Sequence, residues 1–206
     1  MTFVIFDTEY TTWAGCQESG WKEPQKKEIV QISALKVSED LSVISEFNQL
    51  CQPQFNPELS DYFIRLTHIT NETIRSEGRL FKEVFPEFYR FVGSDICFSH
   101  AWGRQYRDKA DGDVVYDNLR WYQVSAPEMK FRNIAPLFQI FYQHHGMDIS
   151  NQSSGQIAKI LKCSDSLKKL GLDEHNALYD VYSILTGIRY FKQDFWSEFE
   201  AAEKNI

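Results

Sequence analysis

The sequence predicts an α/β fold in which a mixed sheet of five strands is flanked by helices. Three segments rich in Ile, Val and Phe begin the chain, and their short connections are typical of an antiparallel meander. Segments with apolar residues at helical spacing then alternate with short strand-like runs. Strands first, followed by helix–strand alternation, favour one sheet with helices packed against it.

The elements follow from these patterns in chain order. We expect strands at residues 2–9, 28–37, 42–50, 95–99 and 129–132. We expect helices at residues 80–92, 111–122, 133–146, 153–161 and 175–191. Pro86 lies inside the first helix and predicts a kink or a later start. Asn133 is the expected N-cap of the helix at 133–146, with Pro136 in its first turn.

Length and composition limit the class of protein. A chain of 206 residues is long enough for one α/β domain, and aromatic residues at 15% exclude a disordered chain. The N-terminus lacks a basic region, and no apolar run approaches the roughly 18 residues of a membrane helix. The cysteines are scattered, which argues against a zinc site or disulfide framework and favours a cytoplasmic protein with reduced thiols; they are Cys16, Cys51, Cys97 and Cys163.

The net charge is −7. Proteins that bind duplexes without specificity neutralise phosphates with Lys and Arg, so this charge argues against that class. It does not exclude a nuclease that grips the end of one strand through metal ions.

Asp7 and Glu9 are two residues apart on the first expected strand, so both side chains project from one face. Two like charges side by side repel, which is unfavourable in a structural strand but suits hard cations that take oxygen ligands. The alternative is a strand end that frays into solvent.

Asp180 lies on the apolar stripe of the expected helix at 175–191, which also carries Ala177, Val181, Ile184 and Ile188. A buried carboxylate without a partner costs several kcal/mol, so it needs a compensating cation. That cation is either a metal ion or an Arg or Lys in an internal salt bridge.

His175 lies five residues before Asp180, at or just before the start of this helix. A neutral histidine there can take a proton from water near pH 7. The other four histidines are interpreted as structural or surface residues; they are His68, His100, His144 and His145.

These residues resemble a known family. FDTEY, which contains Asp7 and Glu9, looks like the first motif of the DEDDh 3′-5′ exonucleases, and HNALYD, from His175 to Asp180, looks like their third motif. EIVQISALKV is similar to the family's second strand, and residues 59–70 resemble a further family segment in which His68 replaces the usual Gly. The resemblance covers about residues 3–190, which implies a ribonuclease H-like exonuclease domain over 1–206 with a C-terminal helical extension.

The middle motif of the family requires one Asp soon after Trp102-Gly103, a dipeptide that resembles the branch of eraser-type exonucleases and sporulation inhibitors. The candidates are Asp108, Asp111, Asp113 and Asp117. Asp111 is preferred, because Val114, Val115 and Leu119 would then form the apolar face of a helix that begins there.

The resemblance implies phosphodiester hydrolysis with two metal ions roughly 4 Å apart, Mg²⁺ or Mn²⁺, releasing nucleoside 5′-monophosphates. The implied ligands are Asp7, Glu9, Asp111 and Asp180. His175 would remove the proton of the attacking water.

Two segments are expected to hold the nucleic-acid strand, because they interleave aromatic and basic residues. Residues 11–27 contain Trp13, Trp21, Lys22, Lys26 and Lys27, and residues 102–109 contain Trp102. Thr8, Trp13 and Trp102 are the expected substrate contacts. For each segment the alternative is a solvated loop with one anchored Trp.

Two rival functions remain at this point. The chain could be a catalytically weak family member that binds nucleic acid or regulates, or a structural protein whose acids form internal ion pairs. The sequence does not separate RNA from DNA as the substrate, since a 2′-hydroxyl contact has no sequence signature here, and it does not reveal the oligomeric state or the cellular pathway.

Overall fold

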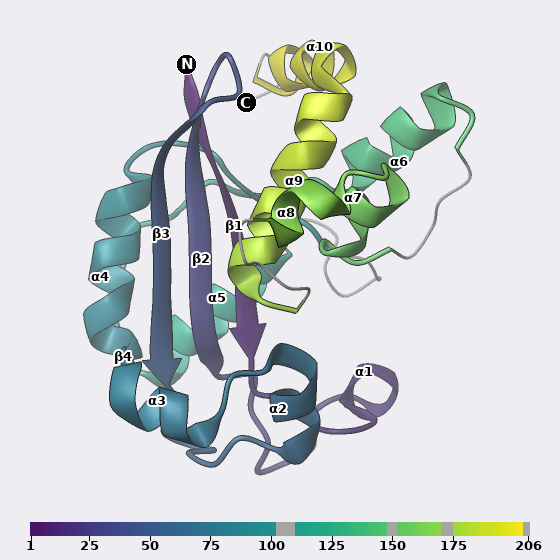
Figure 1. Ribbon diagram of the computed structural model, residues 1–206. Helices are drawn as coiled ribbons and strands as arrows, with labels where there is room; N and C mark the ends of the chain where they lie inside the picture. The colour runs from purple at the N-terminus through teal and green to yellow at the C-terminus, as the bar shows by residue number, and fades with distance from the viewer. Residues whose placement is uncertain (102–109, 148–151, 170–174, 204–206) are drawn as a thin grey trace.

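The computed structural model of the protein describes residues 1–101, 110–147, 152–169 and 175–203. Its core is a mixed sheet with strand order β4-β3-β2-β1-β5-β6 (Figure 1). The strands are β1 (Thr2–Tyr10), β2 (Ile29–Ser38), β3 (Val43–Gln52), β4 (Arg79–Leu80), β5 (Cys97–Ser99) and β6 (Phe131–Asn133). β1, β2 and β3 form the predicted antiparallel meander, and β5 and β6 extend it in parallel.

The predicted five strands are present, and β4 is a sixth that the sequence did not indicate. It pairs in parallel with the end of β3 through only two residues, which is too short to carry an alternating pattern.

Ten helices lie in the described part of the chain. They are α1 (Cys16–Ser19), α2 (Asp61–Thr67), α3 (Asn71–Glu77), α4 (Phe81–Val92), α5 (Asp111–Trp121), α6 (Ala135–His144), α7 (Gln156–Ile160), α8 (Ser164–Lys168), α9 (Ala177–Tyr190) and α10 (Lys192–Glu203). None of them is long and apolar enough to cross a bilayer.

The side chains of β1 point alternately to the two faces of the sheet, and the core therefore has two layers. Val4 and Phe6 face α4 and α5, whereas Phe3 and Ile5 face α6, α9 and α10. Each fully buried large apolar side chain contributes roughly 1.5–3 kcal/mol of transfer free energy. Because side chains repeat with period two, Asp7 and Glu9 continue the face that α9 covers.

Two helix starts differ from the sequence prediction. The N-cap residue of α6 is Ile134, so the prediction of Asn133 was wrong; the Asn133 side chain instead accepts from the backbone N–H groups of Ala135 and Ala101. α4 begins at Phe81 and continues through Pro86, so the later start did not occur.

α2 and α3 form a pair of short helices beyond the end of β3 (Figure 1). Ser60 and Thr70 are their N-caps, and each side-chain oxygen accepts from a backbone N–H three residues later. His68 ends α2 with φ of 61°, a left-handed conformation that favours glycine. A glycine would adopt this conformation without strain, which accounts for the Gly that is usual at this position of the resembled segment.

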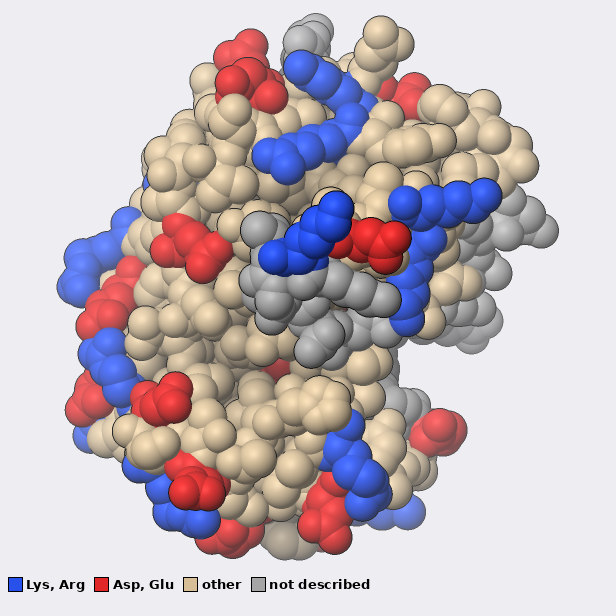
Figure 2. All heavy atoms as spheres, in the orientation of Figure 1, with Lys and Arg blue, Asp and Glu red and all other residues tan. Residues whose placement is uncertain are grey.

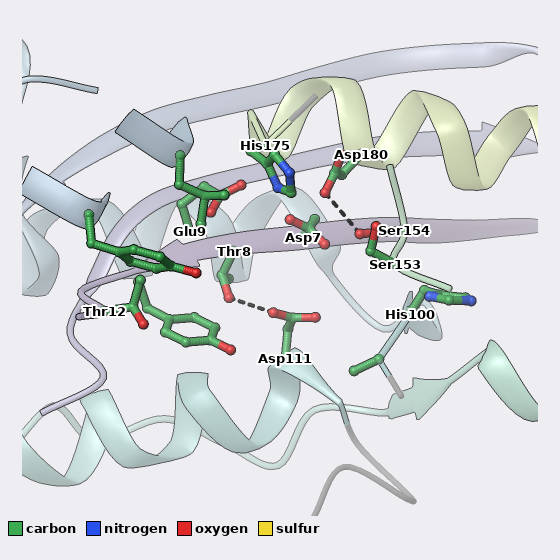
Figure 3. A pocket seen from close by; sticks show the side chains of 14 residues that line it. Asp7, Thr8, Glu9, Thr12, His100, Asp111, Ser153, Ser154, His175 and Asp180 are labelled. Carbon is green, nitrogen blue, oxygen red and sulfur yellow. Dashed lines mark hydrogen bonds between the residues drawn. The ribbon is translucent and has the colours of Figure 1, made fainter. Parts of the chain in front are cut away.

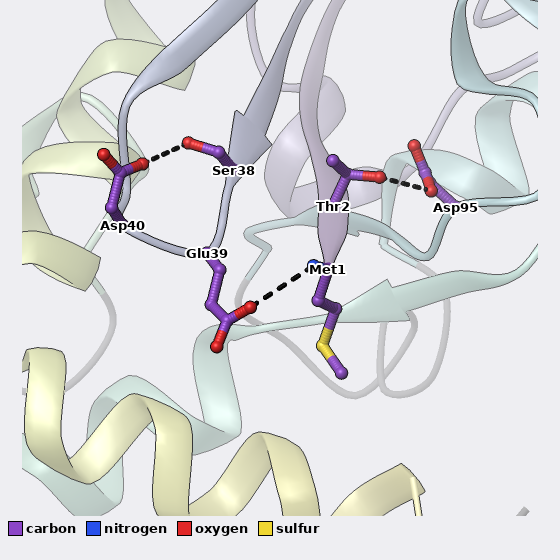
Figure 4. Close-up of polar contacts among 6 residues, drawn as sticks. All are labelled: Met1, Thr2, Ser38, Glu39, Asp40 and Asp95. Carbon is purple, nitrogen blue, oxygen red and sulfur yellow. Dashed lines mark hydrogen bonds and ion pairs between the residues drawn. The ribbon is translucent and has the colours of Figure 1, made fainter.

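Polar contacts hold the start of β1, at the end of the sheet opposite Asp7 and Glu9. The Met1 ammonium lies 3.3 Å from a Glu39 carboxylate oxygen, and Thr2 Oγ1 donates to Asp95 at 2.9 Å (Figure 4). Both contacts are exposed, so each contributes little to stability.

Candidate active site

Three carboxylates meet where β1 passes beneath the start of α9. Asp7 and Glu9 come from β1 and Asp180 from α9, and one oxygen of each lies within 4.8 Å of the others (Figure 3). Asp7 and Asp180 are both 6% exposed, whereas Glu9 is half-buried. Asp180 is core-facing as its helical stripe predicts, since Ala177, Val181, Ile184 and Ile188 are all buried around it.

A pocket of about 340 Å³ opens above these carboxylates. Its lining contains the three acids together with Asp111 and His175. The structure therefore brings together all five residues that the sequence proposes for metal binding and proton transfer.

Asp111 is the first residue of α5, at the position the sequence selects. Val114, Val115 and Leu119 are buried beneath it as expected. Its carboxylate accepts from Thr8 Oγ1 at 2.7 Å, and its backbone N–H donates to Ser99 Oγ at 3.2 Å. Asp111 lies outside the group of three oxygens within 4.8 Å, although it lines the same pocket.

The other middle-motif candidates are placed differently. Asp117 forms an exposed ion pair with Arg120 at 2.7 Å. Asp113 is half-buried on α5 and is not part of the pocket lining. Asp108 lies outside the described residues. Of the candidates that the structure describes, Asp111 alone reaches the pocket.

The electrostatics of the pocket are those of crowded acids. Burial, followed by the charges of Asp111, Asp180 and Glu9, raises the pKa of Asp7 well above its usual range. Burial and the charge of Asp180 likewise raise the pKa of Glu9. Burial raises the pKa of Asp111 to about 6, an effect that the Thr8 hydrogen bond and the Lys27 charge oppose. The ionised site is therefore unfavourable until positive charge enters it.

The N-terminus of α9 is held by side chains of the sheet. Asn176 is the N-cap, and its Oδ1 accepts from Leu178 N. The first N–H of the helix, that of Ala177, donates to Gln31 Oε1 at 3.1 Å, while Gln31 Nε2 donates to Asn176 and to Asn48. His175 precedes this cap with φ of 60° and is exposed at the pocket rim.

Several polar pocket residues were missed by sequence reasoning, and the contacts of two of them bear on the site. Ser154 is buried and donates to Asp180 Oδ2 at 2.9 Å. It can do so because α7 begins at Gln156 rather than at residue 153, which leaves Ser154 in the preceding turn. A lone Ser in a turn carries no periodic signal, so the sequence offered no indication of this contact.

His100 is the second missed residue, and its interpretation as merely structural is incomplete. It lines the pocket beside Ala101, and its ring packs edge-on against Phe138 with centroids 5.7 Å apart. Burial lowers the pKa of His100 to about 4, so its imidazole is neutral at pH 7.

The expected substrate contacts are only partly visible. Thr8 lines the pocket, and its hydroxyl orients Asp111. Trp13 is half-buried and does not belong to the pocket lining. Trp102 lies outside the described residues, and the branch within the family that it suggests stays a prediction.

Comparisons with known proteins identify the family of the chain. A family model described as "Exonuclease" (RNase T) matches residues 4–186. A PolC-type DNA polymerase III of Thermotoga petrophila is 32% identical over 106 residues, which is 52% of this chain and 7% of that protein. The DNA polymerase III subunit epsilon of Aquifex aeolicus is 30% identical over 119 residues, covering 52% of each chain. The chain thus spans only a small part to about half of these relatives.

Solved structures share the fold at low sequence identity. Cell-death related nuclease 4 has a TM-score of 0.71 and 16% identity, over 93% of this chain and 64% of that one. The nuclease domain of 3′hExo, a DEDDh family member bound to rAMP, has a TM-score of 0.64 and 19% identity, over 94% and 92%. E. coli exonuclease I in complex with a dA16 oligonucleotide has a TM-score of 0.70 and 14% identity, over 97% and 42%.

At these identities the structural likeness establishes the ribonuclease H-like fold, while the family model covers most of the chain. The chain therefore belongs to the exonuclease (RNase T) family, and its DTE and H-x4-D residues lie together in one pocket.

Proposed function

We propose that this chain is a metal-dependent 3′-5′ exonuclease that shortens single-stranded ends of RNA or DNA and releases nucleoside 5′-monophosphates. The observation that carries the proposal is the convergence of Asp7, Glu9 and Asp180 within 4.8 Å, in a pocket that Asp111 and His175 complete. Two of the structural neighbours are seen with rAMP and with a single-stranded oligonucleotide, which are ligands of the expected classes.

The residues present fit divalent cations. The ligand atoms are carboxylate oxygens, which Mg²⁺ and Mn²⁺ prefer. The charged groups that act on Asp7 are Asp111, Asp180 and Glu9, all of them acids, and together with burial they raise its pKa. We infer that Asp7, Glu9, Asp111 and Asp180 hold two such ions. When bound, the ions supply the positive charge that activates the attacking water and stabilises the leaving 3′-oxygen.

The chain's own residues position the carboxylates and remove a proton from the attacking water. Ser154 donates a hydrogen bond to one oxygen of Asp180, and Thr8 does the same for Asp111, so both pocket carboxylates are held in place (Figure 3). His175 stands at the rim, where its neutral imidazole can take a proton from the attacking water and pass it to solvent. We assign it the role of general base.

The direction and products can be tested with purified protein and an oligonucleotide labelled at its 5′ end. In Mg²⁺ or Mn²⁺ the labelled strand should shorten one nucleotide at a time, and nucleoside 5′-monophosphates should accumulate. An excess of EDTA should stop the reaction, and Asp180→Asn should abolish it. Cleavage that persists in EDTA, or release of the 5′ label first, would contradict the proposal. A chain that binds the strand without releasing nucleotides would be a binding module.

The role of His175 gives a separate prediction. His175→Ala should lower kcat by roughly 10²- to 10⁴-fold, the usual contribution of a general base, while the metal-induced rise in melting temperature persists. His144→Ala is the matched control, because His144 is an exposed histidine of α6 that the pocket does not contain. A His175→Ala enzyme as fast as the control would remove His175 from the mechanism.

A further inference from the structure

Two aromatic rings and a lysine adjoin the catalytic pocket at the end of β1. The rings of Tyr10 and Trp21 lie 5.8 Å apart, and the Lys27 ammonium sits 4.2 Å from the Trp21 centroid and 5.4 Å from that of Tyr10. Tyr10 also lines the pocket that contains the carboxylates. We refer to Tyr10, Trp21 and Lys27 as the aromatic–lysine platform.

Backbone hydrogen bonds fix this platform to the site. The N–H of Thr11 donates to the Glu28 carbonyl, and the N–H of Glu28 donates to Thr11 Oγ1. These bonds extend the β1–β2 ladder beyond Glu9 and place Lys27 beside Tyr10. Trp21 Nε1 donates to the Thr11 carbonyl at 2.9 Å, and Asn118 of α5 donates to the Lys27 carbonyl at 2.8 Å. The platform is therefore anchored by the two elements, β1 and α5, that also carry Asp7, Glu9 and Asp111.

The chemistry of the platform suits a strand of nucleic acid. All three side chains are half-buried, so part of each ring and of the lysine stem faces solvent. Aromatic rings stack on bases of any sequence, and a lysine neutralises a phosphate. The Lys27 charge already reaches the pocket, because it is one of the causes that lower the pKa of Asp111.

The distribution of charge makes a local cation necessary. The protein carries −7, and on the face shown in Figure 2 the Lys and Arg side chains are interspersed with Asp and Glu. A polyanionic substrate is therefore repelled at long range and must be held by contacts close to the site.

We propose that Tyr10, Trp21 and Lys27 form a single-strand subsite beside the catalytic pocket, with the two rings, tilted by 56°, each offering a surface for base stacking and Lys27 binding a backbone phosphate. This inference rests on the proposed nuclease function, since it takes the ligand to be the substrate strand. The inference assigns phosphate binding to Lys27 and not to the neighbouring lysines of residues 11–27.

Lys26 provides the matched control. Its ammonium also lies over two rings, at 5.2 Å from Phe55 and 5.3 Å from Trp121. Neither of those rings belongs to the pocket lining. Lys26→Gln and Lys27→Gln therefore remove the same charge from similar surroundings, at adjacent positions, but only Lys27 adjoins the site.

The test measures strand binding in an Asp180→Asn background, so that hydrolysis does not interfere. A short labelled RNA oligonucleotide and the DNA oligonucleotide of the same sequence are titrated at several salt concentrations. Lys27→Gln should weaken binding and reduce the slope of log K against log salt by about 0.7, the value for one phosphate of a single strand. Lys27→Arg should retain the affinity and the salt slope, and Lys26→Gln should bind like the Asp180→Asn protein without a further substitution. Trp21→Leu should weaken binding roughly 5- to 150-fold, the loss expected for one stacked base.

Equal effects of Lys26→Gln and Lys27→Gln would overturn the inference, and so would a parent protein that binds neither oligonucleotide. Melting temperatures identify any variant that has lost its fold, and Lys27→Arg then decides the role of the charge. If Lys27→Gln alone weakens binding but the wild-type chain hydrolyses nothing, the subsite stands and the nuclease proposal fails. If the wild type hydrolyses and Lys27→Gln binds normally, the nuclease proposal stands and the subsite fails.

Discussion

Asp7 and Asp180 occupy positions where an apolar side chain would ordinarily lie. Asp7 follows Phe3 and Ile5 on one face of β1, and Asp180 is surrounded on α9 by residues such as Val181 and Ile184 that are fully buried. An apolar residue at either place would extend the core and stabilise the fold. Acids at both places lower stability, and under the proposed function they would provide oxygen ligands for cations, which is the expected trade between function and stability.

The middle carboxylate gives the sharpest prediction at this scale. Asp111→Asn should remove nearly all activity, because it deletes a pocket charge while the amide can still accept from Thr8. Asp113→Asn should change the rate by less than about 5-fold, since a nearby charge outside the pocket contributes about 1 kcal/mol at most. Single-turnover rates on one labelled oligonucleotide compare the two variants.

The two variants have matched chemistry, and melting temperatures verify that both are folded. An inactive Asp113→Asn with an active Asp111→Asn would place the ligand at residue 113. If both variants remain active, the ligand lies in residues 102–109, where Asp108 is the candidate.

Asp7, Glu9 and Asp180 could be predicted from sequence because each breaks a pattern, whereas Asp111 was selected by the family resemblance and by helix phase. A charge on an apolar stripe, or two like charges on one strand face, is visible without coordinates. Ser154, His100 and Tyr62 also line the pocket, but they come from turns and a short helix where no period exists to be broken. Their contribution depends on which segments meet in space, and a single sequence does not contain that information.

At the scale of elements, the site depends on how α9 begins. The first two N–H groups of α9 are satisfied by Gln31 and by Asn176 rather than by water. Gln31 is 2% exposed and lies opposite Glu9 in the β1–β2 pairing. One amide side chain therefore links the strand pair that carries Asp7 and Glu9 to the helix that carries Asp180. This helix begins at Ala177, two residues after His175.

Gln31→Leu tests this link. The substitution keeps the volume but leaves the buried Ala177 N–H without its partner, which should cost about 1–3 kcal/mol of unfolding free energy, while Asn48 Oδ1 still accepts from Ser33. It should also lower kcat more than it raises KM, because a displaced start of α9 would move Asp180, and His175 just before the helix, out of alignment with the acids of β1. Gln49→Leu on β3 is the control, since Gln49 is half-buried and lines a neighbouring cavity rather than the catalytic pocket. Equal losses in the two variants would show that Gln31 has no positioning role.

The long elements were predictable, and of the short ones only β5, β6 and α7 were expected. α5 and α9 carry apolar stripes over three turns, so their position and phase agree with the sequence prediction to within two residues. β4 and the helices α1, α2, α3 and α8 are too short for a period to emerge. The N-caps Ser60 and Thr70 were available as signals for α2 and α3, because both capping residues favour helix starts.

At the scale of the whole molecule, the acidic site makes stability depend on pH and metal. The pKa of Asp7, Glu9 and Asp111 is raised in the folded state, chiefly by burial, so the folded protein binds more protons than the unfolded chain. The contribution of these carboxyls to the unfolding free energy is therefore fully present below about pH 4, their pKa in the unfolded chain. It is lost as pH rises through their pKa in the folded protein, about 6 for Asp111. His100, whose pKa is lowered to about 4 by burial, acts in the opposite direction over the same range.

Asp7→Asn separates the two effects, because His100 is common to both proteins. In chelator at about pH 7.5 the variant should melt at a higher temperature than the wild type, since a buried and repelled charge is gone. This advantage should shrink as pH falls toward about 5.5, where the wild-type carboxylates take up protons. Mg²⁺ at about 100 times its Kd should raise the wild-type melting temperature by about 5–10 °C, from roughly 2.7 kcal/mol of binding free energy. The gain for Asp7→Asn should be smaller.

Calorimetry or circular dichroism at matched ionic strength measures the melting temperatures of both proteins. NaCl replaces MgCl₂ in a control that separates specific binding from screening. A wild-type protein that melts above Asp7→Asn in chelator at neutral pH would mean that a cation of the chain already neutralises Asp7. A gain from Mg²⁺ no larger than that from NaCl would mean that the carboxylates do not hold divalent ions. Either result would contradict the metal site. The predicted pattern requires buried carboxylates whose charges lower the unfolding free energy, a loss that protons relieve at low pH and metal relieves at neutral pH.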